Sequence, residues 1–309
     1  MSGDAVPFRF NFVLDGGGDG DAVAHSAEGN ASRIEAERSA EEAGEAEELR
    51  LDDSTATTSS VGADGYGLQQ VGKATRLWKV VKLLSQSILV EGLDEATDLV
   101  PGRYEGGFKV WECSIDLCNY LVEKYNLEGA ESESSAPSRG LVGMSVLELG
   151  CGQGLPGILC LAKGADRVVF QDFNREVLES VTHPCVLRNL REGEIATNGD
   201  VRYVSGDWGG CKALLGNHDF DLILTAETIY EPRSVPALLD LLAWCLKPQR
   251  GVVLVATKVY YFGVGGGVGP FEEAVRAQGL FHLEDAFSVD DGASNMRKVL
   301  LLRRNKVEL

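Results

Sequence analysis

Basic residues are scarce in this chain of 309 amino acids. Lysine and arginine number 29 against 47 aspartates and glutamates, which gives a formal net charge of −18. A nucleic-acid-binding surface usually shows an excess of basic residues, so direct binding of nucleic acid is not expected. Fourteen of the acidic residues, but only four basic ones, fall within residues 1–60. Such an acidic protein can still attract a basic protein by long-range electrostatic steering.

Long apolar runs and paired cysteines are also missing. The apolar runs are far shorter than the ~20 residues of a membrane-spanning helix, and no basic region followed by an apolar core marks the N-terminus. The seven cysteines are odd in number, none forms a Cys-x-x-Cys pair, and most lie in apolar runs. We expect buried small side chains in a reducing compartment rather than disulfides or zinc ligands. The prediction is an intracellular protein with no metal site and no membrane contact.

The composition divides the chain into three parts. Residues 16–65 hold too few large apolar side chains to offset the entropy of ordering, which predicts disorder. Within this stretch, residues 33–50 fit a transient acidic helix. Before it, an aromatic island at residues 8–12 fits either a docking strand or an incidental cluster. An amphipathic helix fits residues 72–93 of the lead-in that follows, although a strand stays open there. The expected parts are an acidic, mostly disordered tail (1–70), the lead-in (71–100) and a globular domain (101–309).

Strands and helices are expected to alternate through the globular domain. Strands are predicted at 144–149, 168–172, 201–205, 220–225, 251–257, 281–288 and 297–304. Helices are predicted at 113–126, from Pro156 to about 163, and at 174–190, 234–246 and 270–278. This alternation indicates an α/β fold with a doubly wound, seven-stranded, mostly parallel sheet. The last two strands have no helix between them and should pair antiparallel.

Residues 146–157 carry the strongest functional signal, with the sequence Val-Leu-Glu-Leu-Gly-Cys-Gly-Gln-Gly-Leu-Pro-Gly. An apolar strand that contains Glu148 breaks into alternating glycines, beginning with Gly150 and Gly152. Glycines at this spacing let a strand turn into a helix while the backbone comes close to a ligand, and the helix N-terminus faces the same place. An acid two residues before the first glycine favours a ligand with a positive portion. The pattern predicts S-adenosylmethionine, whose methionine end carries an ammonium beside the sulfonium.

A dinucleotide is the rival ligand for this loop. Gly152, Gly154 and Gly157 match the dinucleotide glycine pattern. The register argues against it, because an acid and a further glycine come earlier and a proline lies inside the supposed loop. A glycine-rich turn that binds no ligand is the other alternative.

Polar residues follow the second, third and fourth strands, where a doubly wound sheet binds its ligands. Asp172 can accept hydrogen bonds from two ribose hydroxyls, and capping of the next helix is its alternative role. Asp207 and Trp208 suit an adenine, which a carboxylate can bind at its amine and an indole can stack on, although a lone tryptophan also suits a core. Glu227 and Tyr230 lie where a methyl acceptor must approach and are the candidate catalytic residues, with plain surface positions as the alternative.

A segment rich in glycine and aromatic residues follows the fifth strand, at residues 258–269. A phosphate-binding loop would continue with Gly-Lys-Ser or Gly-Lys-Thr, which is missing. A mobile aromatic lid fits these residues better.

Three blocks of sequence now point to a family. The first is YEGGFKVWEC at residues 104–113, the second is FQDFN at 170–174, and the third joins ETIY at 227–230 to YFGVGGG at 261–267. Together with FRFNF at 8–12, they resemble the eukaryotic histidine protein methyltransferases, a branch of the seven-β-strand methyltransferases allied to the family-16 lysine methyltransferases. The lysine-modifying relatives lack the Phe-Gly-Val-Gly-Gly-Gly stretch, which favours the histidine-modifying branch.

The resemblance covers about residues 98–304 and implies a Rossmann-like class I methyltransferase fold with S-adenosyl-L-methionine as cofactor. Ala226 stands where the family often has serine, so a hydroxyl contact is lost or was made by the backbone only. Tyr260 stands where relatives can carry histidine, which weakens a catalytic role for a ring there. With Glu148 and Gly152 from the glycine loop, the implied cofactor-binding residues are Val110, Trp111, Glu112, Cys113, Ser114, Gly150, Gln171, Asp172, Phe173, Gly206, Asp207, Trp208 and Ala226.

The resemblance also implies the acceptor, a histidine ring nitrogen in a large-subunit ribosomal protein, the third in the standard naming. A free imidazole has a pKa of ~6.5, so the neutral nucleophile is abundant at pH 7. Glu227 could then hold the far ring N–H and fix the tautomer. Lysine methylation by the same fold and a non-catalytic binding protein are the alternatives. A location in cytoplasm and nucleus follows only from the implied substrate, and a monomer is the default expectation.

Overall fold

The computed structural model describes residues 46–51, 66–71, 74–82, 87–92, 106–125, 140–192, 199–290, 292 and 295–305. The aromatic island at residues 8–12 and most of the acidic tail lie outside the described residues, so the predictions for them stay predictions. None of the helices in the described ranges is long and apolar enough to cross a membrane.

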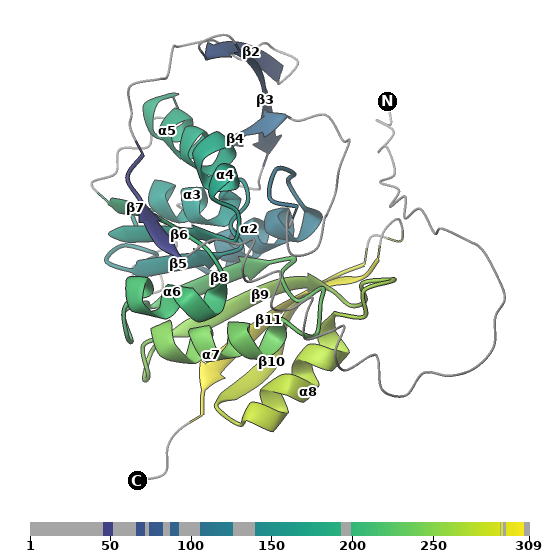
Figure 1. Ribbon diagram of the computed structural model, residues 1–309. Coiled ribbons are helices and arrows are strands. Elements are labelled where there is room, and N and C mark those ends of the chain that lie inside the picture. The colour runs from purple at the N-terminus through teal and green to yellow at the C-terminus, as the bar shows by residue number, and fades with distance from the viewer. Residues whose placement is uncertain are drawn as a thin grey trace, which may run out of the picture.

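An eight-stranded sheet forms the centre of the molecule, in the order β1-β7-β6-β5-β8-β9-β11-β10 (Figure 1). Strands β7, β6, β5, β8 and β9 are parallel, whereas β1, β11 and β10 run antiparallel to their neighbours. The strands are β1 Glu47–Leu49, β5 Ser145–Leu149, β6 Arg167–Asp172, β7 Asp200–Ser205, β8 Leu222–Ala226, β9 Val252–Lys258, β10 Phe281–Val289 and β11 Arg297–Arg304. The seven predicted strands and the terminal antiparallel hairpin are confirmed.

Helices cover both faces of this sheet (Figure 1). Because both faces are covered, the central strands are almost continuously apolar, as in the Leu-Ile-Leu-Thr-Ala run of β8. One apolar cluster lies under α2 Glu112–Lys124, α3 Leu155–Ala162, α4 Arg175–Val177, the π-helical turn η2 Leu178–Thr182 and α5 His183–Glu192. The second lies under α6 Trp208–Leu215, α7 Val235–Cys245 and α8 Val268–Gln278. The predicted helix at 174–190 is thus three consecutive pieces, and α6 was not predicted.

The eighth strand corrects the expected count of seven strands. At residues 46–51, the part of these ranges that the structure describes, it also corrects the expectation of disorder and of a helix. Strand β1 pairs with the edge strand β7, with Glu48 opposite Val204. Leu49 is buried, and Glu47 and Glu48 form ion pairs with Arg175 and Arg202 of the domain. A three-residue strand among acids has no apolar period of its own, so the sequence does not predict it. The strand forms because the open edge of β7 supplies its pairing.

The lead-in segment is also built of strands, so the helix that fitted it is wrong. A separate antiparallel sheet contains β2 Tyr66–Val71, β3 Ala74–Lys82 and β4 Ser87–Gly92, in that order. Its sequence includes Leu-Trp-Lys-Val-Val in β3 and Ile-Leu-Val in β4, and such β-branched and aromatic residues favour strands. Strand β4 lies against α3 and α5 of the main domain (Figure 1).

Candidate active site at the carboxyl edge of the sheet

The glycine loop after β5 has the conformation that its sequence predicts. Gly150 and Gly152 have φ angles of +61° and +50°, in the left-handed region that favours glycine. A Cβ on Gly152 would lie 3.0 Å from the carbonyl oxygen of Gly107, which belongs to the first family block. The hydroxyl of Thr182, in the π-helical turn, donates to the Gly152 carbonyl at 2.5 Å. The loop is therefore held from both sides by chain segments remote in sequence.

Glu148 lies beneath this loop. The side chain is 3% exposed, and its Oε2 accepts a hydrogen bond from the backbone N–H of Gly157, in the first turn of α3, at 2.8 Å. Burial raises the pKa of the Glu148 carboxyl from 4.5 to about 8, although the Gly157 N–H acts in the opposite direction. In the structure, Glu148 thus links β5 to the first turn of α3 through this hydrogen bond. Its attraction of a positively charged ligand stays a prediction.

The raised pKa predicts how stability depends on pH. Between pH 4.5 and about 8, the folded chain keeps a proton on Glu148 that the unfolded chain releases. The free energy of unfolding from this group is therefore highest below pH 4.5 and falls as pH rises to about 8. Glu148→Gln should stabilise the chain relative to wild type increasingly over that range, by ~5 kcal/mol at most. Urea unfolding at several pH values measures this, with the exposed Glu179→Gln as control. Parallel pH profiles for wild type and Glu148→Gln would contradict it.

Asp172, at the end of β6, holds two parts of the site together. Its carboxylate accepts from the N–H of Gly152 at 2.9 Å and from the N–H of Asn174 at 3.0 Å. The second bond closes the turn that leads into α4, but the N-cap of α4 is Asn174, so the alternative capping role of Asp172 is not borne out. Burial raises the pKa of Asp172 to about 6. The backbone N–H of Phe173 is a third donor to this carboxylate. Because a carboxylate offers about four acceptor positions, three backbone donors still leave capacity for a ribose hydroxyl.

Removing this carboxylate should weaken cofactor binding. Asp172→Ala is expected to raise the Kd for S-adenosylmethionine about 5- to 150-fold, since each charge-assisted bond contributes ~1–3 kcal/mol. Isothermal titration calorimetry measures the change. Asp166→Ala is the matched control, because Asp166 precedes β6 and accepts from the N–H of Gly143 at the other end of the strand. An unchanged Kd in Asp172→Ala would remove Asp172 from the cofactor site.

Gln171, on β6, joins the segment that follows β7 to the glycine loop. Its fully buried side chain donates to the carbonyl of Gly206 at 2.8 Å and accepts from the indole N–H of Trp208 at 3.0 Å and from the N–H of Gly150 at 3.4 Å. Trp208 is half-buried and oriented by this bond. Asp207 is exposed and caps α6 by accepting from Gly209 at 2.7 Å. The predicted residues of β6 and β7 thus meet at one place, where adenine contact by Asp207 and Trp208 stays a prediction.

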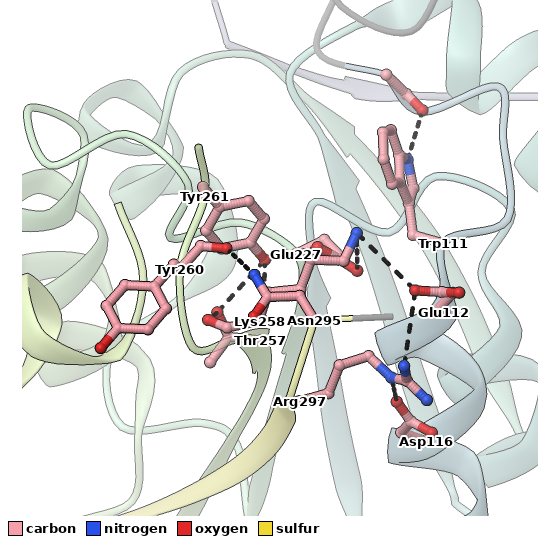
Figure 2. Close-up of polar contacts among 11 residues, drawn as sticks. Trp111, Glu112, Asp116, Glu227, Thr257, Lys258, Tyr260, Tyr261, Asn295 and Arg297 are labelled. Carbon is pink, nitrogen blue, oxygen red and sulfur yellow. Dashed lines mark hydrogen bonds and ion pairs between the residues drawn. The ribbon is translucent and has the colours of Figure 1, made fainter. Parts of the chain in front are cut away.

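The first family block packs onto the glycine loop. The side-chain amide of Gln153 donates to the carbonyl of Phe108 at 2.8 Å, and the indole N–H of Trp111 donates to the carbonyl of Gly106 at 2.9 Å (Figure 2). Trp111 immediately precedes α2, whose first residue is Glu112. Of the remaining predicted residues, Cys113 is fully buried and the others are half-buried, namely Val110, Ser114, Phe173 and Ala226.

Glu227 is the most unusual residue of the acceptor side. It follows β8 with a φ of +59°, a conformation that costs a non-glycine residue energy and that occurs often at functional sites. Its side chain is buried, and Oε2 accepts from the hydroxyl of Tyr261 at 2.6 Å. Oε1 is buried without a hydrogen-bond partner among the described residues, while the Nζ of Lys258 lies 3.5 Å away (Figure 2). One carboxylate oxygen therefore keeps unused acceptor capacity.

Two neighbours of this carboxylate stay protonated. Burial, followed by the charge of Glu227, raises the pKa of Tyr261 well above its usual range, so its hydroxyl remains a donor. The same two causes raise the pKa of the Cys113 thiol. Cys113 therefore faces the acceptor side as a neutral thiol rather than as a nucleophile.

Buried charges link Glu227 to helix α2. Lys258 ends β9, and its Nζ lies 4.0 Å from Glu112 Oε2 and 5.5 Å from the centre of the Trp111 ring. Arg297, paired with Lys258 across β9 and β11, binds Asp116 at 2.6 Å and lies 3.8 Å from Glu112. Figure 2 shows these side chains converging on one place. Sequence reasoning placed Lys258 and Tyr261 only in the expected lid and missed their polar contacts, although the rule that strand ends carry function could have found Lys258. It missed Arg297 and Asp116 altogether.

The predicted lid at residues 258–269 folds back over the segment that contains Tyr230. The N–H of Gly267 donates to the carbonyl of Ile229 at 3.0 Å, and the half-buried Tyr230 ring meets the Tyr261 ring edge-on with centres 6.3 Å apart. Tyr260 and Phe262 are 63% and 77% exposed. The loop therefore joins Tyr261 to the site and leaves two aromatic rings at the surface.

All seven cysteines are buried thiols, as predicted. Within the described residues, no group of three or more His, Cys, Asp or Glu side chains could hold a metal ion.

Comparison with known proteins assigns the family. A family model described as lysine methyltransferase matches residues 102–261. The histidine protein methyltransferase 1 homologue of Dictyostelium discoideum is 44% identical over 214 residues, which cover 68% of this chain and 62% of that protein. The Rattus norvegicus homologue is 37% identical over 233 residues, covering 68% and 60%. The histidine protein methyltransferase 1 of Schizosaccharomyces pombe is 34% identical over 257 residues, covering 68% and 70%.

A class I methyltransferase is the class of protein that this fold and glycine loop define. The chain belongs to the methyltransferase family that the matched model describes, and within it to the group of the histidine protein methyltransferase 1 homologues. The predicted resemblance, the fold class and S-adenosylmethionine as cofactor are thereby confirmed. The chain spans about three fifths of the length of the first two relatives.

Proposed function

We propose that this protein transfers a methyl group from S-adenosylmethionine to a ring nitrogen of a histidine in a protein substrate. The observation that carries the proposal is the buried carboxylate of Glu227, with one oxygen bound by Tyr261 and the other buried beside Lys258 without a hydrogen-bond partner among the described residues. A neutral imidazole has one N–H donor and one unprotonated nitrogen. The N–H can bind the single acceptor atom Glu227 Oε1, which leaves the other nitrogen for the methyl group. The names of the relatives support the same acceptor.

The described residues fit the cofactor. Left-handed glycines after β5 bring bare backbone to the carboxyl edge of the sheet, where a Cβ on Gly152 would meet Gly107. Asp172 on the next strand keeps acceptor capacity for hydroxyl donors, and Trp208 presents an oriented ring. When bound, S-adenosylmethionine supplies the electrophilic methyl group.

The residues of the acceptor side position and stabilise the ring. Glu227 Oε1 would accept the far ring N–H and thereby leave the other nitrogen unprotonated for attack. Positive charge develops on the imidazole as its nitrogen attacks, and the Glu227 carboxylate stabilises that charge. Tyr261 keeps Oε2 in place through its 2.6 Å hydrogen bond. The main task of the site is alignment with the reacting atoms about 3–3.5 Å apart, because no strong base is needed for a group with a pKa of ~6.5.

The proposed substrate is a large-subunit ribosomal protein, the third in the standard naming. The chain's net charge of −18 supports a basic protein partner through long-range attraction. This substrate would place the enzyme in cytoplasm and nucleus, and we propose that it acts as a monomer. Lysine methylation is the second candidate, favoured by the description of the matched family model.

Methyl transfer from labelled S-adenosylmethionine to purified large-subunit ribosomal proteins tests the proposal. Mass spectrometry should locate the label on a histidine of one protein. Label on a lysine would keep the fold and the cofactor but overturn the acceptor. Absence of label, with cofactor binding intact, would point to another substrate or to a non-catalytic binding protein.

A further inference from the structure

Lys258 is a buried cation beside the atom that is expected to hold the acceptor. Its side chain is 9% exposed, and its Nζ lies 3.5 Å from Glu227 Oε1, the oxygen without a hydrogen-bond partner among the described residues. A donor nitrogen bound to that oxygen would lie about 2.9 Å from it. The two distances place any such donor within about 6.4 Å of the Lys258 cation. Every acceptor that uses Oε1 therefore meets the charge of Lys258.

Lys258 and Arg297 lie among three carboxylates, those of Glu112, Asp116 and Glu227. Arg297 is held by Asp116 at 2.6 Å, and Lys258 is closer to Glu227 than to Glu112, at 3.5 against 4.0 Å. Arg297 also lies 3.8 Å from Glu112, so that carboxylate is shared by both cations. Lys258 thus offsets part of the charge of Glu227 beside the oxygen where the acceptor is expected to bind, in a place with little water to screen charge.

We propose that Lys258 is a specificity-determining residue, which makes the site accept a neutral imidazole and reject a lysine ammonium. A neutral ring can donate to Oε1 without charge repulsion from Nζ. A lysine would bring a full ammonium charge to this place when it binds, next to the fixed like charge of Lys258, which offsets part of the attraction of Glu227. An imidazole binds neutral and gains charge only as it reacts. Without the Lys258 cation, the buried carboxylate becomes a binding site for a cation. This inference rests on the proposed histidine acceptor and names how the site selects it.

Labelling of a mixed substrate by Lys258 variants tests the inference. Wild type and Lys258→Met are each incubated with labelled S-adenosylmethionine and purified large-subunit ribosomal proteins, which are then hydrolysed for counting of methylhistidine and methyllysine. The ratio of methylhistidine to methyllysine should fall at least tenfold in Lys258→Met. Lys258→Arg should keep the wild-type ratio because it keeps the charge. Lys298→Met is the matched control, because Lys298 binds Asp285 away from the site.

Thermal melting and the Kd for S-adenosylmethionine establish that each variant is folded, and Lys258→Gln replaces the methionine variant if the latter is unstable. An unchanged ratio in a folded variant, with histidine labelled by wild type, would overturn the role of Lys258 and leave the proposed function intact. If neither methylhistidine nor methyllysine forms while the cofactor Kd is unchanged, the inference is also contradicted. Lys258 would then be needed for methyl transfer itself rather than for selecting histidine over lysine. Wild-type label on lysine alone, or none, would overturn the proposed function and this inference with it.

Discussion

Glu227→Gln is expected to lower kcat/KM for methyl transfer about a hundredfold, the usual size of such a loss when one stabilising group is removed. A glutamine can still accept from Tyr261 and fit the space, but it lacks the negative charge that stabilises the developing imidazolium. The Kd for S-adenosylmethionine should stay unchanged, since Glu227 lies on the acceptor side. Steady-state kinetics with the histidine-containing substrate, together with calorimetric titration of the cofactor, measure both quantities.

Two variants control for local effects of this substitution. Glu231→Gln removes a nearby carboxylate that is bound to Arg233 rather than to Tyr261 and should leave methyl transfer unchanged. Glu227→Gly relieves the cost of a φ of +59° and removes the carboxylate, so it should be as inactive as Glu227→Gln without a loss of stability from the backbone. Full methyl transfer by Glu227→Gln across the pH range would rule out the proposed role.

The meeting of the candidate cofactor residues at one edge of the sheet could be predicted because it follows from local rules. A parallel strand that ends in an acid places that acid at the same edge as every other such strand. Residues 146–157, Gln171, Asp172 and Trp208 therefore meet where the strand pattern indicated. Even here, the sequence did not show that Glu148 would be enclosed under α3 by a bond to Gly157.

The buried charges of the acceptor side depend on pairings that the sequence does not show. Lys258 and Arg297 lie side by side because β9 and β11 pair in one register, and residues directly opposite in an antiparallel pair share a face of the sheet. Asp116 meets Arg297 across 181 positions of sequence. The strand β1 was hidden for the same reason, since its pairing partner β7 lies far along the chain.

The seating of the glycine-rich loop on the acceptor side leads to the second large expected effect. A Cβ on Gly266 would lie 2.1 Å from the carbonyl oxygen of Tyr230 and 2.4 Å from that of Ile229, both rigid backbone atoms. Gly266→Ala must therefore move the loop away from residues 229–230. Because Tyr261 is tied to this loop by hydrogen bonds to Gly265 and Gly266, its hydroxyl should lose its position against Glu227.

Methyl transfer by Gly266→Ala should consequently fall at least tenfold, while the Kd for S-adenosylmethionine stays within twofold of wild type, and unfolding should become easier by ~1–3 kcal/mol. Gly269→Ala provides the matched control, because Gly269 lies in the first turn of the nearby helix α8 and a Cβ there has no atom within 4 Å. This control should keep full activity. If both alanine variants are equally active, the loop does not position Tyr261. If both lose cofactor binding instead, the loop belongs to the cofactor side, and the acceptor must approach Glu227 from elsewhere.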